Sequence, residues 1–421
     1  MNRKQLLILI VLVLVLGGLG IFLRKRQTDS MGGGSAALGQ KLLGKFDVNA
    51  VTRITVKQGT NELNLAKKDN FWRVRERNDY PANYSEISEF LIKVQDLKIV
   101  QTEAVGPSQL PRLALVPGTS TNSALVVDFK DQNDKPIKSL LLGKKHMKKS
   151  DRPSPYGDMG EEGFPDGRWV KLSDSDTVAV ISDALANIEP KPDQWLKKDF
   201  FKIEKPRSIA VAFPAATNSW KLTRDTETAE WKLADPKPGE QLDASKATGV
   251  VNPLGNPAFV DVATTAKPEE VGLDKATVVT VETFEDFTYT IKAGSKTNDN
   301  YPLTMTVAAQ VAKDRAPGKD EKPEDKDKLD KEFKEKQKKL EEKLAQEKAF
   351  EKWTYIVSNW TVEPLLKERA QLMAEKKDEK KDEAKPDEPK KDAGIGIDPL
   401  KLDSTPPANP APLAPPPAPQ N

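Results

Sequence analysis

The sequence predicts an α+β fold of two related units, each a mostly antiparallel sheet packed with a helix, after an N-terminal transmembrane helix. The first observation is a duplicated pair of alternating strands in which the second strand opens at a tryptophan. One pair is Asn61–Leu65 and Phe71–Val74, and the other is Asn218–Leu222 and Glu230–Leu233. Apolar and polar residues that alternate with a period of two indicate strands with one buried face. The repetition therefore predicts that one strand-rich module occurs twice.

Each pair of strands is followed by a helical pattern, which is the second observation behind the α+β prediction. After the first pair, apolar residues three and four apart run from Ile87 to Leu97, with Asn83 or Ser85 as the N-cap. After the second pair, a helix-like stretch covers Ala244–Leu254. Pro253 lies inside that stretch, and proline disrupts a helix interior, so the second helix should be the shorter one.

The chain opens with an apolar run from Leu6 to Leu23. As a helix rising about 1.5 Å per residue, this run would span about 27 Å, which is close to the thickness of a membrane's hydrocarbon core. Three basic residues follow the run directly, where a cleaved signal peptide would carry small residues. We therefore expect an uncleaved membrane anchor over residues 1–26. A signal peptide cleaved late, near Ser35–Ala37, is the alternative.

Basic residues flank both ends of the apolar run, so the positive-inside rule nearly balances and leaves the orientation open. A short basic N-terminus, here Arg3 and Lys4, most often stays in the cytoplasm. This favours a single-pass protein of the cytoplasmic (inner) membrane whose bulk lies outside the cytoplasm. Residues 27–40 are rich in glycine and serine, and we expect them to form a flexible tether.

The first unit is expected over residues 41–200. Val51–Val56 alternates, and a turn at Gln58–Asn61 joins it to the next strand. Glycine and asparagine accept the positive φ that such turns require, so a β-hairpin is expected here. The further predicted elements are a hairpin over residues 124–142, a polar loop over 144–167, and strands over 169–172 and 177–181.

The second unit is expected over residues 201–373, with a charged helical insertion at 313–350. Apolar residues of this insertion, at steps of four, seven and four, are Leu329, Phe333, Leu340 and Leu344. That spacing is similar to a coiled-coil seam, and a solvated charged helix with ion pairs four residues apart is the favoured interpretation. The other predicted elements are a strand over 208–213, a hairpin over 278–291, a strand over 301–311 and a helix over 362–373.

Two further tryptophans, Trp169 and Trp353, open a second pair of similar segments. We interpret Trp169 as the counterpart of Trp353, as Trp72 is of Trp231, with the insertion accounting for the wider separation in the second unit. An indole on the inner face of a small sheet buries a large apolar area. A core role is therefore favoured for all four tryptophans over a ligand-binding role.

Residues 374–421 are expected to form a disordered tail. Lysine, glutamate and aspartate dominate its first part, and proline and alanine dominate from Asp398 onward. Such compositions bury too little apolar surface to offset the entropy of ordering, and the last part has polyproline character. A passive tail and a peptide that binds a partner are the two interpretations.

The composition of the chain excludes several kinds of site. A net charge of +2, from 66 basic and 64 acidic residues, gives no electrostatic basis for binding nucleic acid. The absence of cysteine excludes disulfides, thiolate metal sites and thiol nucleophiles. With a single histidine and no cysteine, a zinc site is not expected either.

No catalytic motif stands out, and we assign no catalytic, cofactor-binding or metal-binding residues. His146, the single histidine, lies in a basic segment that we expect to be a surface loop. A histidine base needs a nucleophile and an orienting acid, and no such set is recognisable. Carboxylate pairs such as Glu161–Glu162 and Glu269–Glu270 are expected to be solvated turn acids, because glycosidase chemistry needs a defined separation across a cleft.

Several of these segments together resemble the domain of unknown function 4340 family. The segments that carry the resemblance are Phe71–Val74, Tyr80–Ala82, Leu142–Lys144, Trp169–Val170 and, in the second unit, Glu270–Leu273. The first unit departs from the family's Gly-Leu segment at Leu113–Pro117. The resemblance covers residues 45–310 and 352–373, and the family has no catalytic residues to carry over.

The resemblance implies a membrane-anchored protein, because members of the family often carry a lone N-terminal anchor. They are typically associated with ABC transport systems of the gliding-motility type, beside a permease and an auxiliary membrane protein. We therefore expect a non-enzymatic, extracytoplasmic accessory or binding protein of such a system, with the membrane (through Leu6–Leu23) and the transporter subunits as partners. A cell-envelope scaffold that uses the charged helix and the tail is the alternative. A carboxylate-based hydrolase is the least favoured interpretation.

Overall fold

The computed structural model describes residues 38–375, except 121, 149–163, 174, 176, 265–266 and 318–320. The predicted membrane anchor over residues 1–26 lies outside the described residues. So do nearly all of the predicted tether and all but the first two residues of the predicted tail. Within the described part of the chain, no helix is both long enough and apolar enough to cross a membrane.

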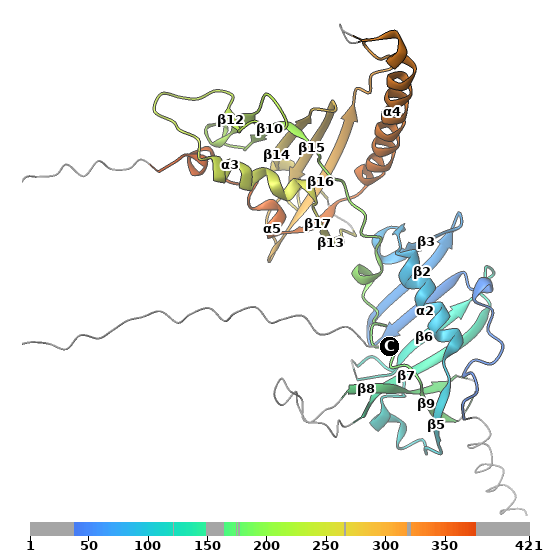
Figure 1. Cartoon of the computed structure of the whole chain (residues 1–421). Coiled ribbons are helices and arrows are strands. Elements are labelled where there is room, and N and C mark those ends of the chain that lie inside the picture. The colour runs from blue at the N-terminus through green and yellow to red at the C-terminus, as the bar shows by residue number, and fades with distance from the viewer. Residues whose placement is uncertain are drawn as a thin grey trace, which may run out of the picture. The chain divides into compact units, whose positions relative to one another are not determined.

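The described residues form two mostly antiparallel sheets with few helices (Figure 1). The first sheet has the strand order β4-β3-β2-β1-β6-β7-β8-β9-β5. Its strands are β1 (Arg53–Gln58), β2 (Asn61–Lys68), β3 (Phe71–Val74), β4 (Tyr80–Pro81), β5 (Ile99–Glu103), β6 (Leu125–Lys130), β7 (Pro136–Lys148), β8 (Phe164–Leu172) and β9 (Val178–Ile181). The two hairpins predicted for this sheet are confirmed as β1-β2 and β6-β7.

The second sheet has the strand order β12-β11-β10-β14-β15-β16-β17-β13. Its strands are β10 (Pro206–Ala212), β11 (Trp220–Thr223), β12 (Lys232–Leu233), β13 (Phe259–Val262), β14 (Thr277–Thr283), β15 (Phe287–Ala293), β16 (Asn300–Ala309) and β17 (Tyr355–Ser358). The hairpin predicted over residues 278–291 is confirmed as β14-β15.

The two sheets share one strand order. If β4 is set aside, the first order runs β3-β2-β1-β6-β7-β8-β9-β5, and the second matches it position by position from β12 to β13. The α+β class and the two mostly antiparallel sheets predicted from the sequence are confirmed. The strands of the first sheet fall within residues 53–181 and those of the second within 206–358. The unit boundaries at 41–200 and 201–373 stay predictions.

The matched strand order corrects one predicted equivalence. Trp169 lies in β8, whose counterpart is β16, whereas Trp353 lies just before β17, whose counterpart is β9. Trp169 and Trp353 are therefore not at corresponding positions, and the prediction that paired them is wrong. A tryptophan at the start of an alternating run marks many strands equally well, so the local pattern could not tell neighbouring strands apart. The charged insertion separates β16 from β17, where the first sheet has only residues 173–177.

A pair of glycines lies at corresponding places in the two sheets. Gly143 is in β7, and Gly294 directly follows the counterpart strand β15. A Cβ at Gly143 would lie 2.3 Å from the carbonyl oxygen of Leu113, and one at Gly294 would lie 2.2 Å from that of Val271. Neither position can hold a side chain unless the backbone shifts, because the facing backbone approaches so closely. The same close approach in both sheets supports the correspondence between them.

The helix that follows the first strands of each unit lies against its sheet, α2 (Tyr84–Asp96) on the first and α3 (Ala244–Val251) on the second (Figure 1). Asn83 caps α2 by accepting a hydrogen bond from the backbone N–H of Ser85, and Asp243 caps α3 in the same way. The prediction of a shorter second helix is confirmed, because the helix passes into a 3-10 turn at Asn252–Gly255, which contains the proline.

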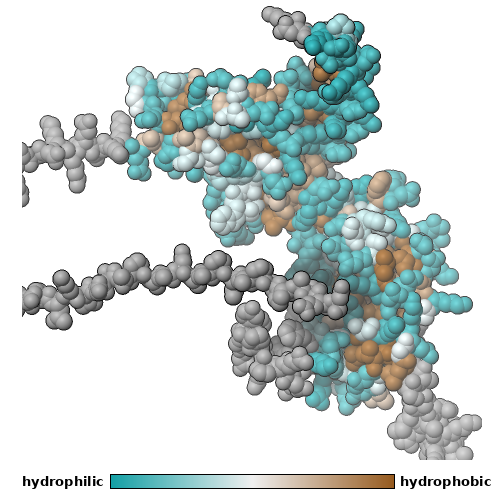
Figure 2. All heavy atoms as spheres, in the orientation of Figure 1, coloured by the Kyte–Doolittle hydropathy of each residue, from teal (hydrophilic) through white to brown (hydrophobic). Residues whose placement is uncertain are grey.

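The charged insertion contains α4 (Lys326–Lys348), whose surface in Figure 2 is mostly hydrophilic. Its C-terminal half departs from a fully solvated helix. Leu340 and Leu344 are partly buried against the core, and Glu347 is only 5% exposed. Backbone N–H of Lys202 and the hydroxyl of Tyr289 both donate hydrogen bonds to the Glu347 carboxylate. This half of α4 is therefore docked on the second sheet, and coiled-coil pairing of its apolar seam stays a prediction.

The last described residues correct another predicted element. The helix expected over residues 362–373 is wrong, since only the short α5 (Asn359–Val362) and a 3-10 turn (Arg369–Leu372) form there. Arg369 is buried and binds Asp235 and Glu240, which ties this segment to the β12–α3 connection. The other 3-10 turns are Val48–Ala50, Arg75–Arg77, Leu110–Leu113, Pro192–Trp195, Ala216–Asn218, Leu273–Lys275, Pro323–Asp325 and Ala349–Lys352.

Candidate functional site

The structure corrects the predicted surroundings of His146. The segment expected to be a loop is part of strand β7, and the imidazole Nδ1 lies 2.6 Å from Asp166 Oδ1 on the neighbouring strand β8. The hydrogen bond to the imidazole lowers the pKa of the Asp166 carboxyl. Trp169 packs edge-on against the ring. A histidine–acid pair becomes a catalytic base only beside a nucleophile, and none joins the contacts described for His146.

The four repeated tryptophans differ in their burial. Trp72 is 4% exposed and belongs to the core, as predicted. Trp169, Trp231 and Trp353 are only partly buried and pack against the hydrophobic clusters, so the predicted core role is confirmed in full only for Trp72. Of these three, Trp231 lines a cavity.

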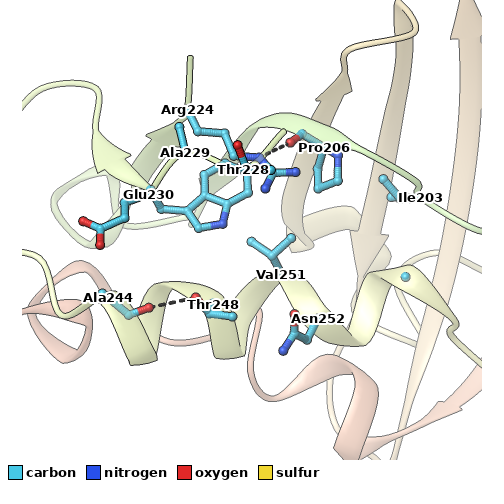
Figure 3. A pocket seen from close by; sticks show the side chains of 12 residues that line it. Ile203, Pro206, Arg224, Thr228, Ala229, Glu230, Ala244, Thr248, Val251 and Asn252 are labelled. Atoms are coloured by element: carbon cyan, nitrogen blue, oxygen red, sulfur yellow. Dashed lines mark hydrogen bonds between the residues drawn. The ribbon is translucent and has the colours of Figure 1, made fainter. Parts of the chain in front are cut away.

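This cavity, which we call the Trp231 cavity, has a volume of about 400 Å³. It lies between the connection that leads from β11 to β12 and the helix α3. Figure 3 shows Thr228, Ala229 and Glu230 on one side of it and Ala244, Thr248 and Asn252 on the other. Ile203, Pro206 and Val251 supply apolar surface at its inner end. Apolar surface with a few polar groups is the usual composition of a small-ligand site.

Arg224 is the charged group that the fold fixes at this cavity. Its Nε donates a hydrogen bond to the carbonyl oxygen of Pro206 at 2.7 Å, and its Nη1 donates one to that of Glu227 at 2.6 Å. Its guanidinium carbon lies 4.7 Å from the centre of the Trp231 ring, in a cation–π contact. Burial lowers the pKa of Arg224, and the nearby Glu227 carboxylate opposes that effect. The side chain remains a cation at neutral pH because the ordinary pKa of arginine lies far above 7.

The first sheet has the corresponding tryptophan, Trp72, buried in its core. Lys67 lies over the ring of Trp72 at 5.2 Å, as Arg224 does over Trp231. The helices explain the difference when they are aligned on their capping residues. The buried residues of α2 are Ile87, Phe90, Leu91 and Val94, and the residues at the same distance from the cap in the second unit are Ala247, Val250, Val251 and Leu254. Three of the four positions carry a smaller side chain in the second unit, and one of them, Val251, lines the Trp231 cavity in place of the larger Leu91.

A second cavity, of about 550 Å³, lies between α2 and residues 183–195. Carboxylates dominate its rim, but two of them are already paired within the chain. Glu89 binds Lys93 at 2.7 Å, and Glu189 binds Lys191 at 2.5 Å. These exposed pairs reduce the negative charge that the rim could offer to a ligand, so the Trp231 cavity is the stronger candidate.

The structure places only part of the other predicted acid pairs. Glu161 and Glu162 lie outside the described residues, and Glu270 forms an exposed pair with Lys267 at 3.8 Å. No group of three or more histidine, aspartate or glutamate residues in the described part of the chain could hold a metal ion. The sequence did not single out Arg224. The sequence pattern that could have indicated this site is the combination of small residues in the second helix with a cation and a tryptophan in the strands before it.

The strand order and the helix on each sheet define an α+β protein with one fold pattern present twice. Residues 159–276 match the model of a family described as a domain of unknown function, DUF4340. The resemblance predicted from the sequence is confirmed over this stretch of 118 of the 421 residues, and every residue that lines the Trp231 cavity falls inside it. Comparisons with curated proteins and with solved structures gave no match.

Proposed function

We propose that this chain is a non-enzymatic, membrane-anchored binding protein that acts outside the cytoplasm as an accessory of an ABC-type transport system. The Trp231 cavity is the observation that supports the binding role. Its volume of about 400 Å³ lies within the range of roughly 300–1,000 Å³ that small-ligand sites occupy. It leaves Trp231 partly buried, whereas the corresponding Trp72 of the first sheet is 4% exposed and belongs to the core.

The apolar run Leu6–Leu23 supports the anchored part of this proposal. An anchor there would confine the folded units to a membrane surface and raise their effective concentration beside a permease. The family association noted from the sequence supports the choice of an ABC-type system. A cation held by backbone carbonyls, with a tryptophan against it, favours binding over hydrolysis, because neither group transfers a proton at neutral pH.

Affinity purification from membranes tests the transport role. The full chain should recover an ATPase and a permease subunit, and a variant without residues 1–26 should recover much less of both. Recovery of no transporter subunit by the full chain would contradict the proposal. A reporter enzyme that is active only outside the cytoplasm should be active when it is fused after residue 375. A reporter that is active only inside the cytoplasm should be inactive at the same position.

A cell-envelope scaffold is the second candidate, because the outer face of α4 exposes a dense set of charges. Lys334, Lys338 and Lys339 are all exposed. Reversal of these three charges should remove envelope partners if the chain is a scaffold. If it is a transport accessory, the same variant should still recover the ATPase and the permease.

A further inference from the structure

We infer that the Trp231 cavity binds an organic carboxylate with an apolar body, in which Arg224 holds the carboxylate and Trp231 contacts the body. This inference rests on the binding role proposed above and names the class of ligand. It follows from the donors that the chain leaves free, from the charge at the inner end of the cavity and from the apolar surface around it.

Arg224 has N–H donors that the described part of the chain does not use. A guanidinium carries five N–H donors in a fixed fork, and the two hydrogen bonds to Pro206 and Glu227 use one each from Nε and Nη1. Both N–H groups of Nη2 have no acceptor among the described residues. A carboxylate matches the spacing of such a fork and forms charge-assisted hydrogen bonds with it. The two backbone bonds fix the guanidinium before the ligand arrives, which reduces the entropy lost on binding.

The charge of Arg224 is not neutralised by an ion pair. No carboxylate in the described part of the chain lies within ion-pair distance of its guanidinium; the hydrogen bond from Nη1 goes to the backbone oxygen of Glu227. Glu230 lines the cavity, but Figure 3 shows its carboxylate at the end away from Pro206. Arg77, which is also partly buried, is instead paired with Asp261. The buried Arg168 is the other arginine that donates to backbone carbonyls and has no ion pair among the described residues. The inner end of the cavity therefore favours an anion.

The body of the ligand should be apolar and flat enough to lie against an indole. Ile203 is 3% exposed and Val251 is 9% exposed, so their lining surface belongs to the wall of the core. Aromatic rings pack on one another with a gain of about 0.5–1.5 kcal/mol beyond simple burial. The polar rim formed by Thr248 and Asn252 would remain in contact with water. An aromatic ring joined to a carboxylate by a short chain fits this arrangement.

Two sources could supply this chemistry, a free aromatic acid and the C-terminus of a peptide that ends in an aromatic residue. Titration calorimetry on the full-length protein in detergent, with 3-phenylpropionate and the tripeptide Gly-Gly-Phe as probes, separates them. The neutral controls are 3-phenylpropanamide and the amidated tripeptide. At least one acid should bind, and its neutral control should bind at least about tenfold more weakly, since a hydrogen bond to a charged group contributes that much.

Variants locate the site. Arg224→Gln should weaken binding of the acid at least about tenfold and should leave binding of the neutral control unchanged. Lys67→Gln removes the equivalent cation over Trp72 and should have no effect. Thr248→Phe places a large side chain at the mouth of the cavity without touching Arg224, and it should abolish binding while the unfolding temperature stays the same. Thr248→Phe keeps the test decisive if Arg224→Gln fails to fold.

Several results would overturn the inference. Equal binding of the acid and its neutral control would show that Arg224 does not select an anion. Binding that survives in Thr248→Phe would place the ligand elsewhere, and absence of binding by both acids would exclude the ligand class. Recovery of transporter subunits by the wild-type chain is measured separately, so a failure of the ligand class can be told from a failure of the transport role.

Discussion

Glu347 offers the most direct test of how the charged insertion is held on the second sheet. Its carboxylate is 5% exposed and accepts hydrogen bonds from the Lys202 backbone N–H at 3.0 Å and from the Tyr289 hydroxyl at 2.6 Å. Lys343 lies 3.8 Å away on the preceding turn of α4. Burial and the hydrogen bond to this carboxylate both raise the pKa of Tyr289, so the phenol stays protonated and keeps donating.

Glu347→Ala should destabilise the protein by about 4 kcal/mol. The substitution removes the acceptor of a part-buried and a buried donor, and each loss costs about 1–3 kcal/mol, or about 2–6 kcal/mol for the pair. The upper end does not apply, because the Tyr289 hydroxyl can still donate to the carbonyl oxygen of Lys202 at 3.4 Å. The lost contact with Lys343 contributes less than about 1 kcal/mol, because that pair is at the edge of ion-pair distance. Glu347→Gln keeps one acceptor oxygen and should cost roughly half as much.

Urea unfolding of the protein without residues 1–26 measures this loss, and trypsin cleavage within α4 reports whether the helix detaches. Glu342→Ala is the matched control, since Glu342 lies on the same helix with an exposed side chain and only a weak pair to Lys338. A double-mutant cycle with Tyr289→Phe should give a coupling of about 1.5–3 kcal/mol between Tyr289 and Glu347. A change below about 1 kcal/mol for Glu347→Ala, or one equal to that of Glu342→Ala, would refute the reasoning.

Three further predictions concern the packing and the acid response. Gly294→Ala should destabilise by about 1–3 kcal/mol in urea unfolding, because its Cβ would lie 2.2 Å from the carbonyl oxygen of Val271; Gly249→Ala, where the Cβ has no neighbour within 4 Å, is the control and should not destabilise. Trp72→Ala should cost about 3–5 kcal/mol and Trp231→Ala less than half as much, since only the first indole is fully buried; equal losses would contradict this. Arg369 lowers the pKa of Glu240 to about 2, so the stability from this pair is complete above the ordinary value of 4.5 and is lost as the pH falls from 4.5 toward 2. Glu240→Gln should flatten that part of the stability profile, and an unchanged slope would count against the pair.

Much of this fold follows from local patterns in the sequence. Alternation placed the hairpins, and the three-and-four spacing with its asparagine placed α2, because each signal comes from neighbouring residues. The predicted equivalence of Trp169 and Trp353 failed because each opens a segment of similar alternating pattern. Only the strand order shows that Trp169 lies in β8, whereas Trp353 precedes β17, the counterpart of β9. The burial of Glu347 could not be predicted either. A glutamate on a charged helix becomes buried only if distant donors, here Lys202 and Tyr289, meet it.

The candidate site could not be predicted for the same reason, because it depends on residues that are distant in the sequence. Trp231 was noticed as a repeat of Trp72, and equal positions suggested equal burial. The difference involves the side chains of the helix that lies across from them, where Val251 stands in place of the larger Leu91. Cavities depend on the summed volume of non-local neighbours, which a strand pattern does not record. Alignment of the helix caps at Asn83 and Asp243 is the sequence signal that could have revealed it.

One fold pattern occurs twice, and of the corresponding tryptophans Trp72 and Trp231 only Trp231 is open to a ligand. Labelling the seven tryptophans with 5-fluorotryptophan and recording fluorine NMR tests this claim directly. Each resonance is assigned by a tryptophan-to-phenylalanine substitution, and a soluble paramagnetic agent and then 3-phenylpropionate are added. The Trp231 resonance should broaden with the agent and shift with the acid, while the Trp72 resonance should do neither. Equal protection of the two tryptophans from the agent, or a shift at Trp72 with none at Trp231, would contradict the claim.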